Sequence, residues 1–378
     1  MLRSPSTPSP AGAVLPADPI RVGLIGYGFA GETFHAPFIE AVGGLELAAV
    51  VTSDPERRRR SAAAHPGAVL LGSVDELWPA AADLGLELVV VAAPNRAHLP
   101  VSLAALDAGL AVVVDKPLAP TAAEGRRLVE EAARRGLLLT VFHNRRWDGD
   151  FLTVRRLAAA GALGDVWRFE SRYERWRPHP RLDVWRERAD PAEGGGILLD
   201  LGSHLVDQAI VLLGRPRSVY AEVARRRPGA EVDDDVFIAV EHDGGARSHL
   251  WASSVVPRPG PRFRVLGGHA GYEVGGMDVQ EEALKRGERP GGPGWGVAPP
   301  DRWGTLGTED DLAPVPTEPG DYGRFYEGVV AALRAGGPPP VDPLDAVLTL
   351  EVLDAARASA RSGQTVVLGL DADADAVS

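Results

Sequence analysis

The chain has 378 residues, enough for two domains that each bury a core of their own. The 52 acidic residues outnumber the 40 basic ones, and the resulting net charge of -12 disfavours a nucleic-acid partner, which needs a basic face. Cysteine is absent, which excludes a disulfide framework, a thiolate nucleophile and a Cys-ligated metal, and we expect a cytoplasmic protein.

Residues 1–19 are dominated by Pro, Ser and Ala without a signal-peptide core, so we predict a disordered leader. No stretch approaches about 18 uninterrupted apolar residues, so no transmembrane helix and no membrane partner are expected. Short β-rich runs then alternate with helical patterns, and strands are predicted at 20–25, 45–51, 68–71, 86–92, 110–115 and 137–142. Such alternation is typical of an α/β domain with a parallel, doubly wound sheet, which binds its ligand at the carboxyl ends of the strands.

After about residue 143 the pattern changes to longer strands joined by turns, and only one clear helix, at 201–213, interrupts them. The run at 218–223 alternates outward and inward side chains, as a half-buried antiparallel strand does. Further strands are predicted at 168–173, 235–241, 247–254 and 263–266. We therefore predict an α+β domain over 143–370 with an open, mostly antiparallel sheet, whose uncovered face binds another subunit of a homo-oligomer.

The last third of the chain begins with a segment rich in Gly and Pro, residues 287–320, which we predict to be a long loop of the kind that often forms a lid. Two amphipathic helices are predicted at 321–335 and 343–362, followed by a strand at 365–370. Residues 371–378 are predicted to form an acidic tail.

A glycine motif, GYGFAG at residues 26–31, follows the first predicted strand and opens a helix, the context that G-x-G-x-x-G requires. The first glycine permits the tight turn, the second lets the backbone approach a pyrophosphate, and the third lets the helix pack against the strand. The helix N-terminus adds N–H donors and positive potential. The alternative is a turn without a ligand. We predict a dinucleotide-binding Rossmann domain over 20–142, with cofactor contacts from Gly26, Gly28, Phe29, Ala30 and Gly31.

The end of the second predicted strand bears on the choice of cofactor. NAD-binding versions of the motif place an Asp or Glu there to hold the ribose 2′-hydroxyl, whereas NADP-binding versions offer an Arg. This chain has Thr52 at that position, Ser53 beside it and Arg57 nearby. These side chains suit a 2′-phosphate, so we favour NADP over NAD. The alternative is that residues 57–60 are a solvated helix face and Asp54 only caps the helix.

Two segments hold the candidate catalytic residues. Lys116 stands at the carboxyl end of the fifth predicted strand, where a ligand binds, and Pro117 fixes the backbone after it. Three glycines at 194–196 precede a helix with Asp200 and His204. A carboxylate four residues before a histidine shares its helical face and can orient the imidazole and raise its basicity. The alternatives are a surface lysine and a structural histidine.

Together these motifs resemble the glucose-fructose oxidoreductase / inositol dehydrogenase / rhizopine-catabolism (Gfo/Idh/MocA) family, over about residues 20 to 370. Where the family usually has Glu-Lys-Pro, this chain has Asp-Lys-Pro at residues 115–117, so Asp115 replaces the glutamate. Segments at 142–153, 185–187, 200–208 and 319–322 are similar to a subgroup that includes NADP-dependent scyllo-inositol dehydrogenases. The resemblance implies a Rossmann domain, an α/β domain with an open antiparallel sheet that often forms the oligomer interface, and hydride transfer between NAD(P) and a secondary hydroxyl of a sugar or cyclitol.

The resemblance also implies roles for particular residues. It places Lys116, Asp200 and His204 in the substrate site beside the nicotinamide. It adds contacts to the cofactor from Pro94, Asn95, His98, Lys116 and Arg145, and a border to the same site from Trp185 and Arg186.

We expect direct hydride transfer without a metal. His204 takes the hydroxyl proton, Lys116 stabilises the alkoxide and Asp200 orients the pair, although Lys116 also has the chemistry of a proton acceptor. One alternative is a non-catalytic sugar- or nucleotide-sensing regulator on the same fold, which the presence of all three candidates disfavours. The other is an enzyme for another reaction, such as reduction of a small carbonyl or imine, or dehydration through a transient oxidation.

Overall fold

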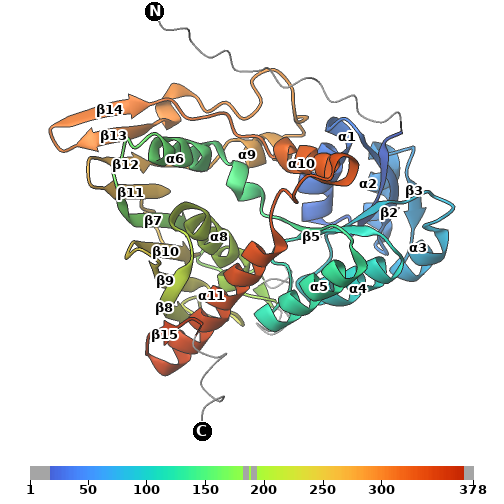
Figure 1. Ribbon diagram of the computed structural model, residues 1–378, viewed down its shortest axis with the longest axis horizontal. Helices are drawn as coiled ribbons and strands as arrows, with labels where there is room; N and C mark the ends of the chain where they lie inside the picture. Colours follow the sequence, from blue (N-terminus) through green and yellow to red (C-terminus); the bar gives the residue numbers. More distant parts are fainter. Residues whose placement is uncertain (1–17, 182–186, 189–193, 370–378) are drawn as a thin grey trace, which may run out of the picture.

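The computed structural model describes residues 18–181, 187–188 and 194–369. All but the last two residues of the predicted leader lie outside these ranges, as does the predicted acidic tail. Figure 1 shows an α/β protein with two sheets side by side, one built by the first part of the chain and the other by the second. In the described part of the chain, no helix is long and apolar enough to cross a membrane.

The first sheet has six parallel strands in the order β3-β2-β1-β4-β5-β6. The strand order reverses between β1 and β4, so the loops after these two strands open at the point where such sheets bind their ligands. This confirms the predicted doubly wound Rossmann sheet. Its strands are β1 (Ile20–Ile25), β2 (Leu45–Val51), β3 (Val69–Leu71), β4 (Leu88–Val91), β5 (Ala111–Asp115) and β6 (Leu139–Phe142).

Helices connect these strands, and the sequence explains where several of them begin. Asp54 accepts a hydrogen bond from the amide of Arg57 and so caps α2, while Thr121 does the same for Glu124 at the start of α5. The helices are η1 (Gly31–His35), α1 (Ala36–Ala41), α2 (Pro55–Ala64), α3 (Val74–Ala80), η2 (Asn95–Ala97), α4 (His98–Asp107) and α5 (Ala122–Arg135).

The second sheet has nine strands in the order β14-β13-β12-β11-β7-β10-β9-β8-β15, and among the described residues only β7 and β10 pair in parallel. This confirms the predicted, mostly antiparallel sheet. Its strands are β7 (Val166–Glu174), β8 (Pro216–Ala224), β9 (Asp235–His242), β10 (Arg247–Ser253), β11 (Phe263–Gly267), β12 (Gly271–Val274), β13 (Gly304–Thr308), β14 (Asp311–Val315) and β15 (Val366–Val367).

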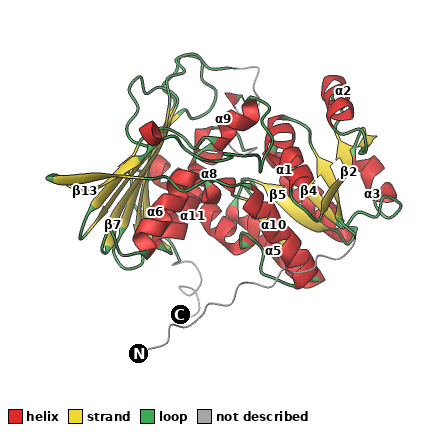
Figure 2. Cartoon of the chain, turned by 90° about the horizontal axis from the view of Figure 1, so that it is seen from above, coloured by secondary structure: helices red, strands yellow, loops and turns green. Residues whose placement is uncertain are grey.

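Helices lie on the face of the second sheet that is turned toward the first, and Figure 2 shows no described element on the opposite face. Burial alternates along β9, because its inward side chains pack under these helices and its outward ones do not. The helices of this part are η3 (Asn144–Trp147), α6 (Gly149–Ala159), α7 (Ile197–Asp200), α8 (Gly202–Leu213), α9 (Gln280–Lys285), η6 (Pro300–Arg302), α10 (Gly323–Ala335) and α11 (Pro343–Ser362).

One prediction of local structure is wrong, and two others differ from the structure at their ends. The predicted loop at 287–320 contains the hairpin β13–β14, and Pro314 is tolerated because β14 is an edge strand. The predicted helix at 201–213 is confirmed as α8, which begins one residue later, at Gly202, because an interruption at Leu201 separates it from α7. The last predicted strand, 365–370, shortens to β15.

The helix α10 returns to the first sheet although it follows the second in the chain. Phe325, Tyr326 and Val329 are fully buried in one apolar cluster with side chains of β1, β4 and β5. α10 also contacts α1, and α11 contacts α5. The two sheets are therefore joined by buried contacts from the C-terminal helices, which fixes the glycine motif relative to the second sheet.

Candidate active site

The glycine motif forms a tight turn from β1 into a continuous helical run, residues 29–41, whose first part is π-helical. Gly26 has a φ of +99°, and a Cβ there would collide with the carbonyl oxygen of Ala92 at the end of β4. A Cβ on Gly31 would collide with the carbonyl oxygen of Gly26. The backbone of this turn therefore depends on both glycines and forms a cradle open to a phosphate group.

The end of β2 lies beside this turn. Thr52 is buried, Ser53 is exposed, and a guanidinium nitrogen of Arg57 lies 3.6 Å from where a Cβ of Gly28 would stand. Within the described ranges the Arg57 side chain has no ion-pair partner, whereas Arg60, three residues on, pairs with Glu32 at 2.9 Å. The cap formed by Asp54 confirms the structural role considered for it, and it leaves Arg57 beside the glycine turn.

Lys116 and Asp200 form the ion pair at the centre of the candidate site. Lys116 follows β5, Asp200 ends α7, and the Lys116 ammonium donates to the Asp200 carboxylate at 2.8 Å and to its backbone carbonyl at 2.7 Å. The two side chains are 13% and 27% exposed. The pair is thus mostly shielded from water but still reachable by a small molecule, and a charge-assisted hydrogen bond holds the ammonium in place.

His204 lies in the first turn of α8 and is almost fully buried. Burial, and then the charges of Lys116 and Arg145, hold its pKa well below the usual 6.5, so the ring is neutral. Its Nδ1 is buried and has no hydrogen-bond partner among the residues that the structure describes. The expected hydrogen bond to Asp200 is not formed, because the helix breaks at Leu201 and the Asp200 carboxylate bonds to Lys116 instead.

A buried cluster of cations and hydroxyls lies behind His204. The Tyr173 ring centre is 6.2 Å from that of His204, and Arg262 donates to the Tyr173 hydroxyl at 2.7 Å. Arg262 also donates to Gln208 of α8 at 2.8 Å. Neither Tyr173 nor Arg262 was predicted, because Tyr173 belongs to an ordinary strand pattern, Arg262 directly precedes another strand, and no motif marks either residue.

Arg145, predicted as a cofactor contact, follows β6 and is buried. Its guanidinium donates to the Tyr322 hydroxyl at 2.9 Å and pairs with Asp148 and Glu281. Its carbonyl accepts from the Gln208 side chain at 2.8 Å. Arg145 therefore joins η3, α8, α9 and the start of α10 at the boundary between the two sheets.

Two more of the residues predicted to contact the cofactor, Asn95 and His98, follow β4, and their side chains form hydrogen bonds to backbone carbonyls. Both ring nitrogens of His98 face carbonyls, Nδ1 that of Pro117 at 2.7 Å and Nε2 that of Ala93 at 2.9 Å, and burial lowers its pKa. Asn95, directly after Pro94, donates to the carbonyl of Gly194 at 2.9 Å. These side chains tie the β4 loop to the turn after Lys116 and to the glycines before α7.

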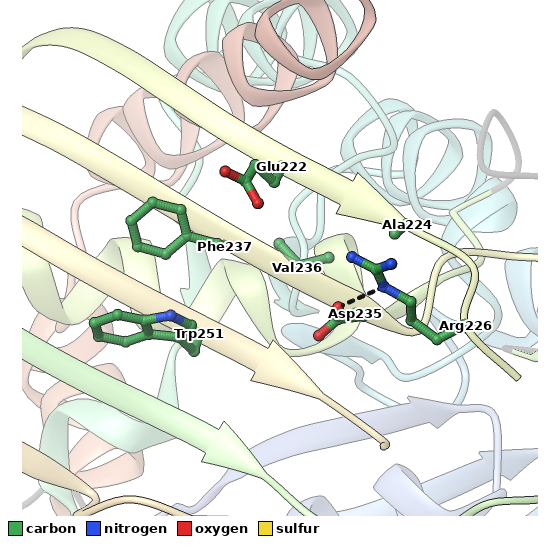
Figure 3. A pocket seen from close by; sticks show the side chains of 7 residues that line it. All are labelled: Glu222, Ala224, Arg226, Asp235, Val236, Phe237 and Trp251. Carbon is green, nitrogen blue, oxygen red and sulfur yellow. Dashed lines mark hydrogen bonds and ion pairs between the residues drawn. The ribbon is translucent and has the colours of Figure 1, made fainter. Parts of the chain in front are cut away.

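The remaining predicted residues, Trp185 and Arg186, lie outside the described residues. In the described part of the chain no group of three or more His, Asp and Glu side chains is arranged to hold a metal ion. A small hollow of about 40 Å³ lies beside Asp200 and includes Arg175, Glu187 and Ser254. A larger one, about 340 Å³, lies away from this chemistry on the open face of the second sheet, where Phe237 and Trp251 line it (Figure 3).

Comparison with known proteins agrees with this arrangement. A family model described as "Oxidoreductase family, NAD-binding Rossmann fold" matches residues 20–143, and one described as "GFO/IDH/MocA C-terminal domain" matches residues 151–273. The chain is 34% identical to the scyllo-inositol 2-dehydrogenase (NADP(+)) IolW of Bacillus subtilis (strain 168), over 93% of this chain and 96% of that protein. It is 40% identical to the uncharacterized oxidoreductase YdgJ of Escherichia coli (strain K12), over 93% and 99%. The solved structure of the oxidoreductase yvaA from Bacillus subtilis superposes with a TM-score of 0.86 at 33% identity, covering 93% and 99%.

Proposed function

The chain belongs to the Gfo/Idh/MocA family of oxidoreductases with an NAD-binding Rossmann fold, and on this basis we propose that it transfers a hydride between NADP and a secondary hydroxyl of an inositol or a related polyol. The observation that supports this most is the Lys116–Asp200 ion pair, with neutral His204 in the next helix, at the carboxyl ends of the Rossmann strands. We assign the cofactor to residues 20–142 and the substrate and subunit contacts to residues 143–370.

The residues present fit a nicotinamide dinucleotide, because the two required glycines leave a backbone cradle for its pyrophosphate and Arg57 stands beside it. Bound there, the cofactor supplies the hydride acceptor or donor. Contacts from Phe29, Ala30 and Pro94 remain part of this proposal. A 2′-phosphate fits the Arg57 guanidinium and the hydroxyls of Thr52 and Ser53, and the relative IolW is named as NADP-dependent.

Within the site, Lys116 and His204 divide the chemistry of the hydroxyl. The Lys116 ammonium, held by Asp200, stabilises the oxygen as it gains negative charge. His204 accepts the hydroxyl proton at Nε2, since Nδ1 is buried and the ring is neutral. In the reverse direction the same nitrogen returns the proton to the carbonyl oxygen. In this proposal Asp200 positions the Lys116 ammonium, to which it is hydrogen-bonded.

The open face of the second sheet supports a homo-oligomer. Figure 3 shows Phe237 and Trp251 pointing outward from neighbouring strands, and His249 packs beside both rings. Large aromatic side chains on an uncovered sheet face are typical of a surface that a second subunit buries. We infer that two copies pair through this face in the cytoplasm. Analytical ultracentrifugation of the wild type and of Trp251→Glu tests this inference: we expect an oligomeric wild type that the substitution weakens, and a monomeric wild type contradicts it.

The test of the proposed function is titration of the purified protein with NADPH and, separately, NADH, followed by nicotinamide fluorescence, and then a panel of inositols and sugars with the preferred cofactor. We expect tighter binding of NADPH and oxidation of scyllo-inositol or a related polyol. Binding of neither nucleotide contradicts the proposal and favours a sensing role, whereas binding without turnover of any polyol contradicts the substrate class alone.

A further inference from the structure

Lysine occupies only two positions in this chain, Lys116 and Lys285, although the chain has 40 basic residues. Arginine therefore serves wherever a general positive charge is needed. Lysine differs from arginine in offering a compact, strongly hydrated point charge, which many contacts to phosphate use. One of the two lysines, Lys116, stands at the centre of the candidate active site.

Lys285 is the last residue of α9, on the second part of the chain, yet it lies over the glycine motif. α9 contacts η1, and the Lys285 ammonium is 5.5 Å from the centre of the Phe29 ring. Phe29 stands inside the motif between Gly28 and Gly31 and is half-exposed. Figure 2 shows α9 between the second sheet and α1. An ammonium group from the second domain thus lies close to the glycine turn, where the proposed function puts the pyrophosphate of the cofactor.

The surroundings of Lys285 link it to Arg145. Its ammonium donates to Glu281 at 2.5 Å, and Glu281 also pairs with Arg145. Burial alone raises the pKa of Glu281, but Arg145 and Lys285 together lower it to about 2, so this carboxylate stays ionised between two cations. Among the described residues, Glu281 takes one of the three ammonium protons of Lys285, and the Lys285 side chain is 49% exposed.

These local contacts do not by themselves require lysine. An arginine at this position makes the same pair with Glu281 one turn earlier and a cation–π contact with Phe29 that is at least as good. The feature that distinguishes lysine here is a small ammonium that can reach a phosphate close to the backbone, where a guanidinium is bulkier.

We propose that Lys285 binds the pyrophosphate of the dinucleotide together with the glycine-motif amides, so that the second domain completes the phosphate site. This inference rests on the proposed function. The helix N-terminus offers about half a positive charge, and Lys285 adds a full one. Because Lys285 belongs to the second domain, the contact also holds the two domains together around the cofactor, with Glu281 positioning the ammonium when the site is empty.

The test compares dissociation constants of NADPH and NADH for the wild type, Lys285→Ala and Arg286→Ala, measured by nicotinamide fluorescence. Arg286→Ala is the matched control, because it removes a positive charge one residue away that pairs with Glu288. We expect Lys285→Ala to weaken both nucleotides about tenfold, equivalent to about 1.4 kcal/mol, because both contain the pyrophosphate. Arg57→Ala weakens NADPH alone, and Arg286→Ala leaves both constants unchanged.

A second measurement uses the scarcity of lysine. Reductive methylation with ¹³C-formaldehyde gives the wild type two lysine side-chain signals, and Lys285→Arg identifies which belongs to Lys285. We expect NADPH and NADH to shift that signal alike. If the wild type binds both nucleotides but Lys285→Ala binds them equally well, or if the Lys285 signal does not move, the inference is wrong. If the wild type binds neither nucleotide, the proposed function has failed and the inference with it.

Discussion

Replacing Lys116 with Met tests the centre of the proposed mechanism. The substitution keeps a side chain of similar length and apolar stem but removes the ammonium that bonds to Asp200 at 2.8 Å. An ammonium about 4 Å from a developing alkoxide stabilises it by roughly 4 kcal/mol at an effective dielectric constant near 20. That corresponds to about 10³ in rate. Asp200 offsets part of this charge, so we expect kcat/KM to fall by roughly 10² to 10³, the range found when one oxyanion donor is removed.

The assay follows the absorbance of reduced nicotinamide with NADP and scyllo-inositol, or with the best polyol of the panel. The binding of NADPH, measured by fluorescence, should change little by comparison. Most of the predicted cofactor contacts lie away from Lys116, in the glycine motif and at Arg57. A decrease in kcat/KM of less than about tenfold, or about 1.4 kcal/mol, would refute the assignment of Lys116 as the group that stabilises the alkoxide.

The control separates chemistry from stability. Lys116→Met also removes the cation paired with a largely shielded Asp200 carboxylate, so the single variant is expected to melt at a lower temperature. The double variant Lys116→Met/Asp200→Asn removes both charges. We expect it to regain much of the lost Tm while remaining as inactive as the single variant. Recovery of activity together with Tm would mean that the first loss was structural.

The remaining predictions concern three other positions. Burial and neighbouring cations hold the pKa of His204 well below 6.5, so its ring stays a neutral base as the pH falls through that value. We therefore expect kcat/KM for oxidation to stay level near pH 6.5 and to decline only at lower pH. A half-maximal kcat/KM at or above pH 6.5 contradicts this prediction. Arg57→Ala should weaken NADPH about tenfold, the lower end for a charged hydrogen bond at an exposed site, and leave NADH unchanged, with Arg59→Ala as the control; equal losses for both nucleotides argue against a 2′-phosphate contact. Gly31→Ala places a Cβ against the carbonyl oxygen of Gly26. We expect it to lower the free energy of unfolding by about 1–3 kcal/mol and to weaken nucleotide binding. An unchanged Tm and an unchanged affinity would show that the turn relaxes.

Local patterns were enough to predict the Rossmann half of the fold. Its strands are short apolar runs because helices cover both faces of a parallel sheet, and β4 and β5 are buried along their whole length. The glycine motif determines its own turn, since a Cβ collides with backbone at Gly26 and at Gly31. α11 has the predicted bounds, 343–362, and the structure adds that Asp342 caps it. The strands β12 to β14 were not predicted, because their Gly and Pro residues are typical of loops.

Only the packing of the whole chain decided how the site is assembled. The spacing of Asp200 and His204 suggested a pair, but that rule assumes an unbroken helix, and the break at Leu201 lets the carboxylate bond to Lys116, which lies 84 residues earlier in the chain. Likewise, no local pattern places Lys285 of α9 over Phe29. Sequence periodicity encodes which face of an element is apolar, whereas the partner of a polar side chain depends on which elements the buried core brings together.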